Sequence, residues 1–591
     1  MRIIQLIRQY AAPLALLSVL GALVASPYLI PENPDSAVFR SGTLGLVLLA
    51  CCVHPLVQAF RRADLRTLVC SMAFGLLFGG ALSLGAELSF YGGLLPGMGS
   101  MLRRMAVPVL CTPLLGGLAA RVMMIQPKSA RRPLHLPLGA YMAILLACWL
   151  PLLIAHYPGM LNYDFHTEYE HFMAGRWDNR HPLLYVVICY GIFSLGRAAG
   201  NPELAVLAVT LLRMLALAAA LGYSCVFVQR RRVPAPVSLL LTALYALHPV
   251  FSVMAVSSAK DTPFAAAVLT LSLLAWEALE DPKAFFASRR RCAVFVLSIL
   301  FTWHMRKNGV AAMLMLPLLI AFICGWRTQM AKLCLTGVAL SLLLTACMNA
   351  ALRPVDQLSF QTYSIPAQQL CRAYNVGDMT DEEREELRSW YIDSNWGLQL
   401  LPHLADAAKG SLDPDRLAEN GDAFMDLWAR VGRKNLRVYT EAFLLLNIGS
   451  WYPDDTTHAT IYQPYGLDKG YLQTDEYDLS EYGIGKHNPL PKLRQLYDRI
   501  CRRNIYLKYP VVAQLFAVST PLWVILFAAC TLIARRKGRL AIAAAGVLAL
   551  HLSYLLGPCT LARYMLPLFC LAPAMLAGAL SARNNMERKL P

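Results

Sequence analysis

Long apolar runs without a charge constrain this chain more than any other feature of its sequence. Neither Ala11 to Ile30 nor Gly309 to Trp326 contains an Asp, Glu, Lys or Arg. A helix needs about 20 apolar residues to cross a hydrocarbon layer about 30 Å thick. Of the 591 residues, 57% are apolar and only 15% are charged. The sequence therefore predicts an all-α polytopic protein, integral to the plasma or inner membrane of a cell.

The net charge of +17 has to be interpreted within that class. In a soluble protein such an excess would suggest nucleic acid as a partner. Here the Lys and Arg residues cluster in short loops between apolar segments, where positive charge orients a membrane protein. We therefore expect membrane lipids as partners and no nucleic acid.

The N-terminus and the cysteines exclude two further classes. The first apolar run is longer than the core of a typical signal peptide and more apolar runs follow it, which favours a retained first helix. The 16 cysteines contain no CxxC pair, so neither a zinc ribbon nor a disulfide framework is expected. Cys371 and Cys501 could pair if the loop that contains them lies outside the membrane.

The distribution of basic residues predicts the topology. Arg61-Arg62 follow the second apolar run and are expected in the cytoplasm. Arg230 to Arg232 and Arg289 to Arg291 also become cytoplasmic under one assumption, namely that His181 to Ala199 lies half-embedded at the outer surface instead of crossing. This topology has about 14 transmembrane helices, both termini inside, and a large outer loop of mixed structure. The first outer loop then covers residues 156–202.

Four regions follow from this topology. Residues 1–135 would be accessory transmembrane helices, residues 136–350 a transmembrane core, residues 351–510 an extracytoplasmic loop or domain, and residues 511–591 the last transmembrane helices. Within the large loop, "DMTDEEREELRSWY" predicts an amphipathic helix with a solvated acidic face. The Tyr-rich stretch that begins at residue 449 is more typical of interfacial anchors than of a sugar-binding platform.

Polar residues from distant parts of the chain share the outer face in this topology. The stretch "YPGMLNYDFHTEYEHFMAGRWDNRHPLLY", residues 157–185, is rich in acids and histidines. Lys260-Asp261, Arg306-Lys307 and Arg563 fall on the same side. Positive charge there opposes the orientation rule, which points to an anionic ligand.

Carboxylates and cations at an outer membrane surface suit one chemistry particularly well. Transfer of a sugar from a polyprenyl-phosphate carrier needs a carboxylate to accept the proton of the acceptor hydroxyl. It also needs cations to stabilise the charge that develops on the departing phosphate. The lipid tail explains why such a site would lie at the bilayer edge. We therefore expect a glycosyltransferase that uses a polyprenyl-phosphate sugar donor and an extracytoplasmic acceptor, with its active site facing outside.

The order of these motifs resembles the GT-C superfamily of membrane glycosyltransferases, and its protein mannosyltransferase and aminoarabinose transferase branches most closely. The matching elements are "YPGMLNYD", "RHPLLY", "AKDTPF" and "ARYMLP". The sequence is also similar to an uncharacterised bacterial multispanning family with "YPG…D", "HP", "KD", "R-x-NG" and "IPAQQ" patterns. The resemblance covers residues 136–581 in outline and leaves out the first four helices.

The resemblance implies roles for individual residues. Asp164 would be the general base, with Glu168 as a weaker partner, because this chain has a single Asp where the mannosyltransferases have paired acids. Asp261 would orient the acceptor, and Gln368 and Gln369 would line its groove. The donor phosphate would meet five cationic or polar side chains: His181, Lys260, Arg306, Lys307 and Arg563. Some branches need Mg²⁺ or Mn²⁺, for which Asp164, His166 and Asp261 could supply ligands.

Each of these residues also has a structural interpretation. Asp164 could cap a short helix, and His181-Pro182 could mark the start of one. Lys260-Asp261 could be a self-neutralising pair between two helices. Arg306 and Lys307 could be interfacial anchors that reach toward lipid headgroups.

Three rival functions remain open at this stage. A transporter or flippase of lipid-linked or envelope substrates would be expected to show internal repeats and broken helices, and no clear repeat is found. An O-antigen-ligase type of transferase would rely on Arg and His in a late outer loop. A scaffold without catalytic activity is the third.

Overall fold

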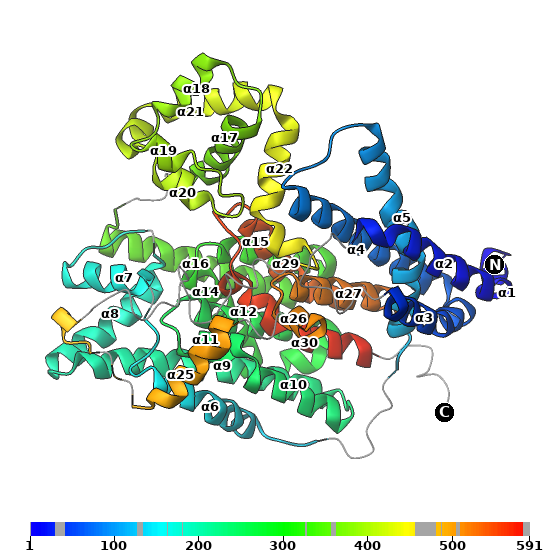
Figure 1. The fold of residues 1–591 in the computed structure, drawn as a ribbon. Coiled ribbons are helices and arrows are strands. Elements are labelled where there is room, and N and C mark those ends of the chain that lie inside the picture. The colour runs from blue at the N-terminus through cyan, green and yellow to red at the C-terminus, as the bar shows by residue number, and fades with distance from the viewer. Residues whose placement is uncertain are drawn as a thin grey trace. The chain divides into compact units, whose positions relative to one another are not determined.

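The computed structural model of this protein describes most of the chain. The described residues are 2–29, 42–126, 134–161, 163–179, 181–325, 328–355, 362–455, 480–485, 487, 489–503 and 509–582. Across these ranges the secondary structure is helical, and extended pairing is limited to isolated bridges (Figure 1). The prediction of an all-α protein is confirmed for them.

Eight helices in the described ranges are long and apolar enough to cross a membrane, or nine if one bent pair counts as a span. The bent pair consists of α10 (Ala235–Leu247) and α11 (Pro249–Val256), which meet at 47°. These helices support an integral membrane protein, whereas the predicted number of about 14 spans is not confirmed. The eight are Ala11–Tyr28, which contains α2 (Ala11–Ala25), then α4 (Leu65–Tyr91), α5 (Met98–Met123), α6 (Leu138–Ala155), α9 (Pro202–Arg230), α12 (Asp261–Glu280), α16 (Gln329–Leu352) and α30 (Ala562–Ser581).

Helix α8 (Leu183–Ala198) follows the His-Pro dipeptide and has 16 residues. At a rise of 1.5 Å per residue a helix needs roughly 20 residues to cross the membrane, and α8 has fewer. Its half-embedded position at the outer surface stays a prediction.

The chain divides into two compact units that differ from the predicted regions. The first unit joins residues 1–125 with residues 357–458 and 554–560, and the second contains residues 126–356, 459–553 and 561–591. The N-terminal helices and most of the large loop thus belong to one unit, although the sequence suggested separate regions.

The first unit combines apolar N-terminal helices with a helical domain. Trp390, Phe424 and Leu427 are buried at the centre of that domain. Leu88 of α4 shares a second cluster with Leu445 and Ile448. The remaining helices of this unit are α1 (Arg2–Gln9), α3 (Gly42–Arg62), α17 (Ser364–Val376), α18 (Asp381–Arg388), α19 (Ser394–Gly397), α20 (Ala405–Gly410), α21 (Pro414–Lys434), α22 (Leu436–Leu446) and α23 (Ile448–Trp451).

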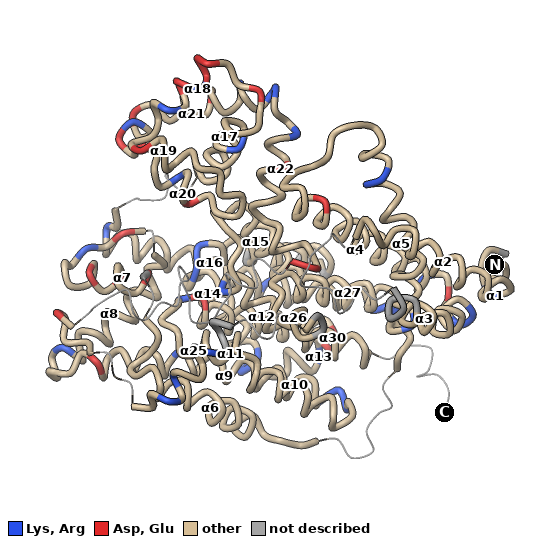
Figure 2. Tube along the Cα trace, in the orientation of Figure 1, with Lys and Arg blue, Asp and Glu red and all other residues tan. Residues whose placement is uncertain are grey.

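Helix α18 confirms the amphipathic helix that the sequence predicted in the large loop. Thr380 caps it, and Glu383 completes a capping box by accepting from the Thr380 backbone N–H. Acidic residues gather at this helix (Figure 2), while Leu387 is buried against the domain. Most of the Tyr-rich stretch that follows the domain, residues 456–479, lies outside the described residues.

In the second unit α12 is the central helix. It packs against α9, α14 (Arg289–Met305) and α30. The Trp276 ring of α12 meets the Phe227 ring of α9 edge-on at 5.7 Å. The helices of this unit that have not been named above are α7 (Tyr163–Met173), α13 (Pro282–Phe286), α15 (Gly309–Cys324), α25 (Pro491–Arg503), α26 (Pro510–Phe516), α27 (Thr520–Ala534), α28 (Gly538–Ala541) and α29 (Ala545–Tyr554).

Candidate functional site

The "YPG" segment before α7 is fastened to the turn between α11 and α12. The Met160 N–H donates to the Val256 carbonyl (3.2 Å), and the Ser258 N–H donates to the Met160 carbonyl (2.8 Å). Gly159 has φ of +154°, and a Cβ there would lie 2.6 Å from Thr210 Oγ1. Only glycine fits such a close approach. This segment therefore places the start of α7 near the start of α12.

The turn between α11 and α12 supplies a lysine and an aspartate. Lys260 occupies the N-cap position and Asp261 is the first residue of α12. A carboxylate is favoured there because helix N-termini carry partial positive charge. Asp261 is only 1% exposed, so its charge needs partners inside the protein.

One partner of Asp261 comes from the turn between α14 and α15. Arg306 adopts an extended conformation directly after α14 and forms an ion pair with Asp261. The Gly309 N–H donates to the Arg306 carbonyl (2.9 Å), and a Cβ on Gly309 would overlap the Thr302 carbonyl oxygen. The "R-x-NG" pattern thus describes a tight helix–helix turn that carries the arginine.

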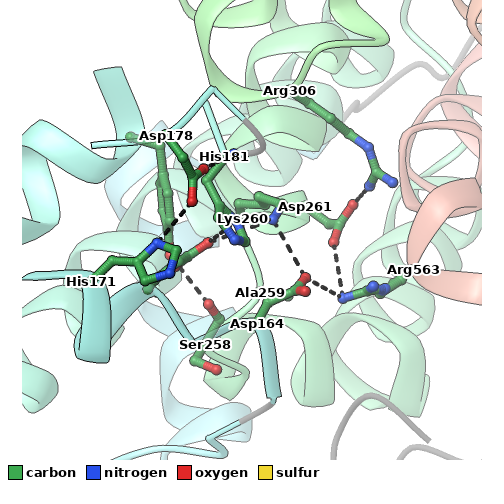
Figure 3. A network of polar contacts seen from close by, with 12 residues as sticks. Asp164, His171, Asp178, His181, Ser258, Ala259, Lys260, Asp261, Arg306 and Arg563 are labelled. Carbon is green, nitrogen blue, oxygen red and sulfur yellow. Dashed lines mark hydrogen bonds and ion pairs between the residues drawn. The ribbon is translucent and has the colours of Figure 1, made fainter. Parts of the chain in front are cut away.

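The second arginine comes from the start of α30. Arg563 Nη1 donates to Asp164 Oδ2 at 3.0 Å and lies 4.0 Å from Asp261 Oδ2. One guanidinium group therefore lies between two carboxylates from different helices (Figure 3).

Lys260 contacts three side chains of the site. Its Nζ lies 3.4 Å from Asp164 Oδ2, 3.5 Å from Glu168 Oε1 and 2.9 Å from His181 Nδ1. The same Nδ1 lies 2.9 Å from Glu168 Oε1. Asp164 and Glu168 lie one helical turn apart on α7, so both reach the same lysine.

A second histidine–carboxylate pair adjoins these residues. His171 Nδ1 lies 2.8 Å from Asp178 Oδ2, and Asp178 Oδ1 accepts from the His181 backbone N–H at 3.3 Å. Asp178 is fixed in turn by a bridge between its strand-like segment and Val355. This pair positions the residues that precede α8.

We refer to the seven joined side chains as the charged cluster. All are largely buried, and each was a candidate site residue in the sequence. The structure brings together α7, the residues just before α8, the turns before α12 and α15, and the start of α30. The charged cluster consists of Asp164, Glu168, His181, Lys260, Asp261, Arg306 and Arg563.

The electrostatics of the charged cluster act most strongly on Asp164. Burial alone would raise the pKa of this carboxyl, but the charges of Lys260, Arg563 and His181 and the Arg563 hydrogen bond hold the pKa well below its usual range. Asp164 is therefore ionised, and in this arrangement it is a weak proton acceptor.

The phosphate-binding role expected of the cations stays a prediction, and the structure shows their partners within the protein. The sequence placed Lys260, Arg306 and Arg563 around a donor phosphate, whereas here each contacts a carboxylate of the protein itself. Burial explains this difference, because a buried charge is costly unless it is paired. Lys307 follows Arg306 in the turn, and its carbonyl accepts from the Val310 N–H at 3.2 Å.

The two glutamines are engaged within the helical domain of the first unit. Gln368 Nε2 donates to the Leu401 carbonyl at 2.8 Å. Gln369 Nε2 donates to the Tyr439 carbonyl (3.2 Å), and its Oε1 accepts from Trp428 Nε1 (2.8 Å). These bonds hold both side chains within the domain, and the acceptor groove that the resemblance implied stays a prediction.

The candidate metal ligands are also engaged. Asp164 and Asp261 contact cations, and His166 Nδ1 lies 3.5 Å from Glu170 Oε2. Among the residues that the structure describes, no three His, Cys, Asp or Glu side chains are arranged to hold a metal ion. The described donor groups therefore do not fit an Mg²⁺ or Mn²⁺ site in this arrangement.

Cys371 is a buried free thiol, and burial raises its pKa to about 12. The pair with Cys501 that the sequence allowed involves a side chain that lies outside the described residues.

Sequence reasoning missed Arg213, which lies on α9 and is 2% exposed. Its Nη1 donates to Tyr185 Oη (3.0 Å) and its Nη2 donates to Thr210 Oγ1 (3.2 Å). The Tyr185 hydroxyl donates to the Ser258 carbonyl at 3.2 Å, two residues before Lys260. Arg213 therefore supports the turn that carries Lys260 and Asp261. An arginine inside an apolar segment was the available signal.

Comparison with known proteins adds one finding. Residues 173–589 match the model of a family described as of unknown function, DUF6020. The match includes His181, Asp261 and Arg563, whereas Asp164 and Glu168 precede its first residue. No curated protein and no solved structure matches the chain. Because the matched region covers well over half of the sequence, this chain belongs to family DUF6020.

Proposed function

We propose that this protein is a glycosyltransferase that moves a sugar from a polyprenyl-phosphate donor to an extracytoplasmic acceptor. The observation that carries the proposal is the convergence of Asp164, Lys260, Asp261, Arg306 and Arg563, which come from widely separated parts of the chain. Buried ionisable groups in a membrane protein are costly and generally serve a function. The GT-C-like order of the motifs supports the same proposal.

In the proposed reaction the cations first change partner. The donor phosphate takes Arg563, Arg306 and Lys260 from the carboxylates that hold them in the unliganded protein. Asp164 thereby loses the positive charges that lower its pKa, and its basicity rises. The donor thus activates the base that the chemistry needs.

The chemical step is a single displacement. The acceptor oxygen forms a bond to the anomeric carbon while the bond between that carbon and the phosphate oxygen breaks. Asp164 accepts the hydroxyl proton, and the departing polyprenyl phosphate keeps the bonding electron pair beside the arginines. The anomeric centre is inverted.

A transporter or flippase of lipid-linked substrates is the second candidate, and one observation favours it. Helices α10 and α11 together are long and apolar enough for a span, and between them the chain breaks at His248-Pro249 and bends by 47°. Broken spans form substrate sites in many transporters. The end of α11 leads directly into Lys260 and Asp261, so this break lies next to the charged cluster in the chain.

Transfer in isolated membranes tests the proposal. Membranes that contain the protein are incubated with a panel of radiolabelled polyprenyl-phosphate monosaccharides, and label in protein, glycolipid and polymer fractions is counted. We expect label to move with the wild-type protein and not with Asp164→Asn. An O-antigen-ligase mechanism predicts that Asp164→Asn retains transfer. Movement of a fluorescent lipid phosphate across vesicles, with no transfer from any donor, would establish the transporter instead.

A further inference from the structure

Two groups of opposite charge contact one nitrogen atom of His181. Glu168 Oε1 and Lys260 Nζ each lie 2.9 Å from His181 Nδ1, and they lie 3.5 Å from each other. An imidazole nitrogen carries either a proton or a lone pair. With a lone pair, Nδ1 can accept from Lys260 and has no proton for Glu168. With a proton, Nδ1 donates to Glu168 and repels the lysine.

Protonation of His181 therefore decides which groups Lys260 can contact. A neutral His181 with its lone pair on Nδ1 keeps the lysine as a hydrogen-bond donor. A positively charged His181 displaces it, because two cations 2.9 Å apart in a buried site repel strongly. The released Lys260 can then turn to an anion.

The opposite side of the imidazole also points to a ligand. His181 Nε2 is buried, and no hydrogen-bond partner reaches it among the described residues. Nε2 carries an N–H both in the neutral ring with its lone pair on Nδ1 and in the protonated ring. A buried donor without an acceptor is costly in either state. A phosphate oxygen would satisfy it.

We propose that His181 is the proton-binding group of the charged cluster, and that an anionic phosphate headgroup binds together with one proton taken up from solvent on His181. This inference rests on the proposed function, because it assumes a lipid-phosphate ligand. The protonated Nδ1 of His181 donates to Glu168, and Lys260 leaves His181 and contacts the headgroup. The incoming negative charge is thereby balanced by one positive charge.

The charges that face His181 are consistent with this role. Glu168 and Asp164 approach from α7, Lys260 from the start of α12, and Asp178 accepts from the His181 backbone N–H. Tyr185 lies one turn into α8 and holds the Lys260 turn through Ser258. Of these carboxylates, Glu168 and Asp164 face the imidazole itself, and Lys260 is the cation that contacts it.

Calorimetry of a short phosphodiester probe tests the inference. Citronellyl methyl phosphate is titrated into the purified full-length protein in two buffers of different ionisation enthalpy. A diester carries a single negative charge throughout the range, so any proton uptake belongs to the protein. We expect about one proton to be taken up per probe bound, and affinity to fall by up to about tenfold per pH unit as the pH rises through the histidine range.

Variants assign the proton to a residue. His181→Gln should bind the probe with about zero proton uptake and a flat pH dependence. His171→Gln removes a neighbouring histidine that contacts Asp178, and it should retain the full uptake. Unchanged uptake in His181→Gln overturns the inference, because another group then takes the proton.

The wild-type measurement alone separates the two proposals. Binding without proton uptake overturns the role of His181 and leaves the lipid-phosphate site standing, with its charge balanced by a cation such as Lys307. Failure of the wild-type protein to bind the probe overturns the proposed function itself, and this inference with it.

Discussion

Arg563 Nη1 lies 3.0 Å from Asp164 Oδ2, although 399 positions of the sequence separate the two residues. The pair joins α7 to α30, the last described helix of the second unit. It also joins an acid that precedes the matched family region to a cation within it. Asp164 and Arg563 are thus the two residues at which the proposed catalytic role can be tested most directly.

Asp164→Asn should separate binding from chemistry. The amide keeps the shape of the side chain but cannot accept the proton, so we expect transfer to fall by about 10²- to 10⁴-fold. Affinity for a phosphodiester should stay the same or rise, because Arg563 and Lys260 lose an internal competitor. Transfer rates and calorimetry of the same preparation measure both. Glu170→Gln, which alters an acid paired with His166, is the matched control, and equal losses in both variants would contradict the assignment.

The pH profile of transfer should reflect the lowered pKa of Asp164. In the free protein this carboxyl stays ionised below the ordinary aspartate value of about 3.9. The acid limb of kcat/KM reports the free enzyme. We therefore expect that protonation of Asp164 does not reduce kcat/KM between pH 4 and 6. A limb in that interval that disappears in Asp164→Asn would contradict the ion pairs in the charged cluster.

Arg563→Met should destabilise the second unit because it leaves two buried carboxylates without their shared cation. Breaking a buried ion pair from one side costs about 3–5 kcal/mol. The double variant Asp164→Asn with Arg563→Met removes one of the stranded charges and should recover part of the loss. Thermal unfolding in detergent, treated as a double-mutant cycle, measures the coupling. Strictly additive losses would show that the two side chains do not interact.

Gly309→Ala should disrupt the turn between α14 and α15. The added Cβ would overlap the Thr302 carbonyl oxygen, so the turn that carries Arg306 has to open. We expect a lower yield of folded protein and a lower melting temperature. Gly191→Ala on α8 is the matched control, because its Cβ meets nothing within 4 Å among the described residues. Similar behaviour of the two variants would contradict the close approach.

Reporter fusions should test the topology on which the outer site depends. Alkaline phosphatase, which is active only outside the cytoplasm, is fused after Gly175, Gly200 or Arg232. We expect activity after Gly175 and Gly200 and none after Arg232. Activity after Gly175 but not after Gly200 would mean that α8 crosses the membrane, and the later loops would change sides.

The sequence predicted the membrane class and the members of the charged cluster well. Hydropathy is a local property, and the Lys260-Asp261 and Arg306 motifs interrupt apolar segments at places where a charge is expensive. The positions of these motifs along the chain were therefore enough to indicate a shared site. Helix α18 was predicted for a similar reason, because its amphipathic pattern is also local to a short stretch of sequence.

The partners of those residues could not be predicted in the same way. Whether Arg306 faces a ligand or Asp261 depends on how α12, α14 and α30 pack, and no local pattern encodes that packing. The same limit applies to Gln368 and Gln369, whose amides bond to carbonyls more than 30 positions away. Arg213 was overlooked because a single arginine in a long apolar helix does not change the prediction of a span.

The backbone pairing of Met160 with Val256 and Ser258 has a consequence for any opening of this protein. Two hydrogen bonds join the strand-like segment before α7 to the turn between α11 and α12. The backbone segments that carry Asp164, Glu168, Lys260 and Asp261 are thus held together. A ligand that entered by separating those four residues would have to break main-chain hydrogen bonds. Opening would instead move the side that bears Arg306 and Arg563, whose contacts with these four residues are ion pairs between side chains.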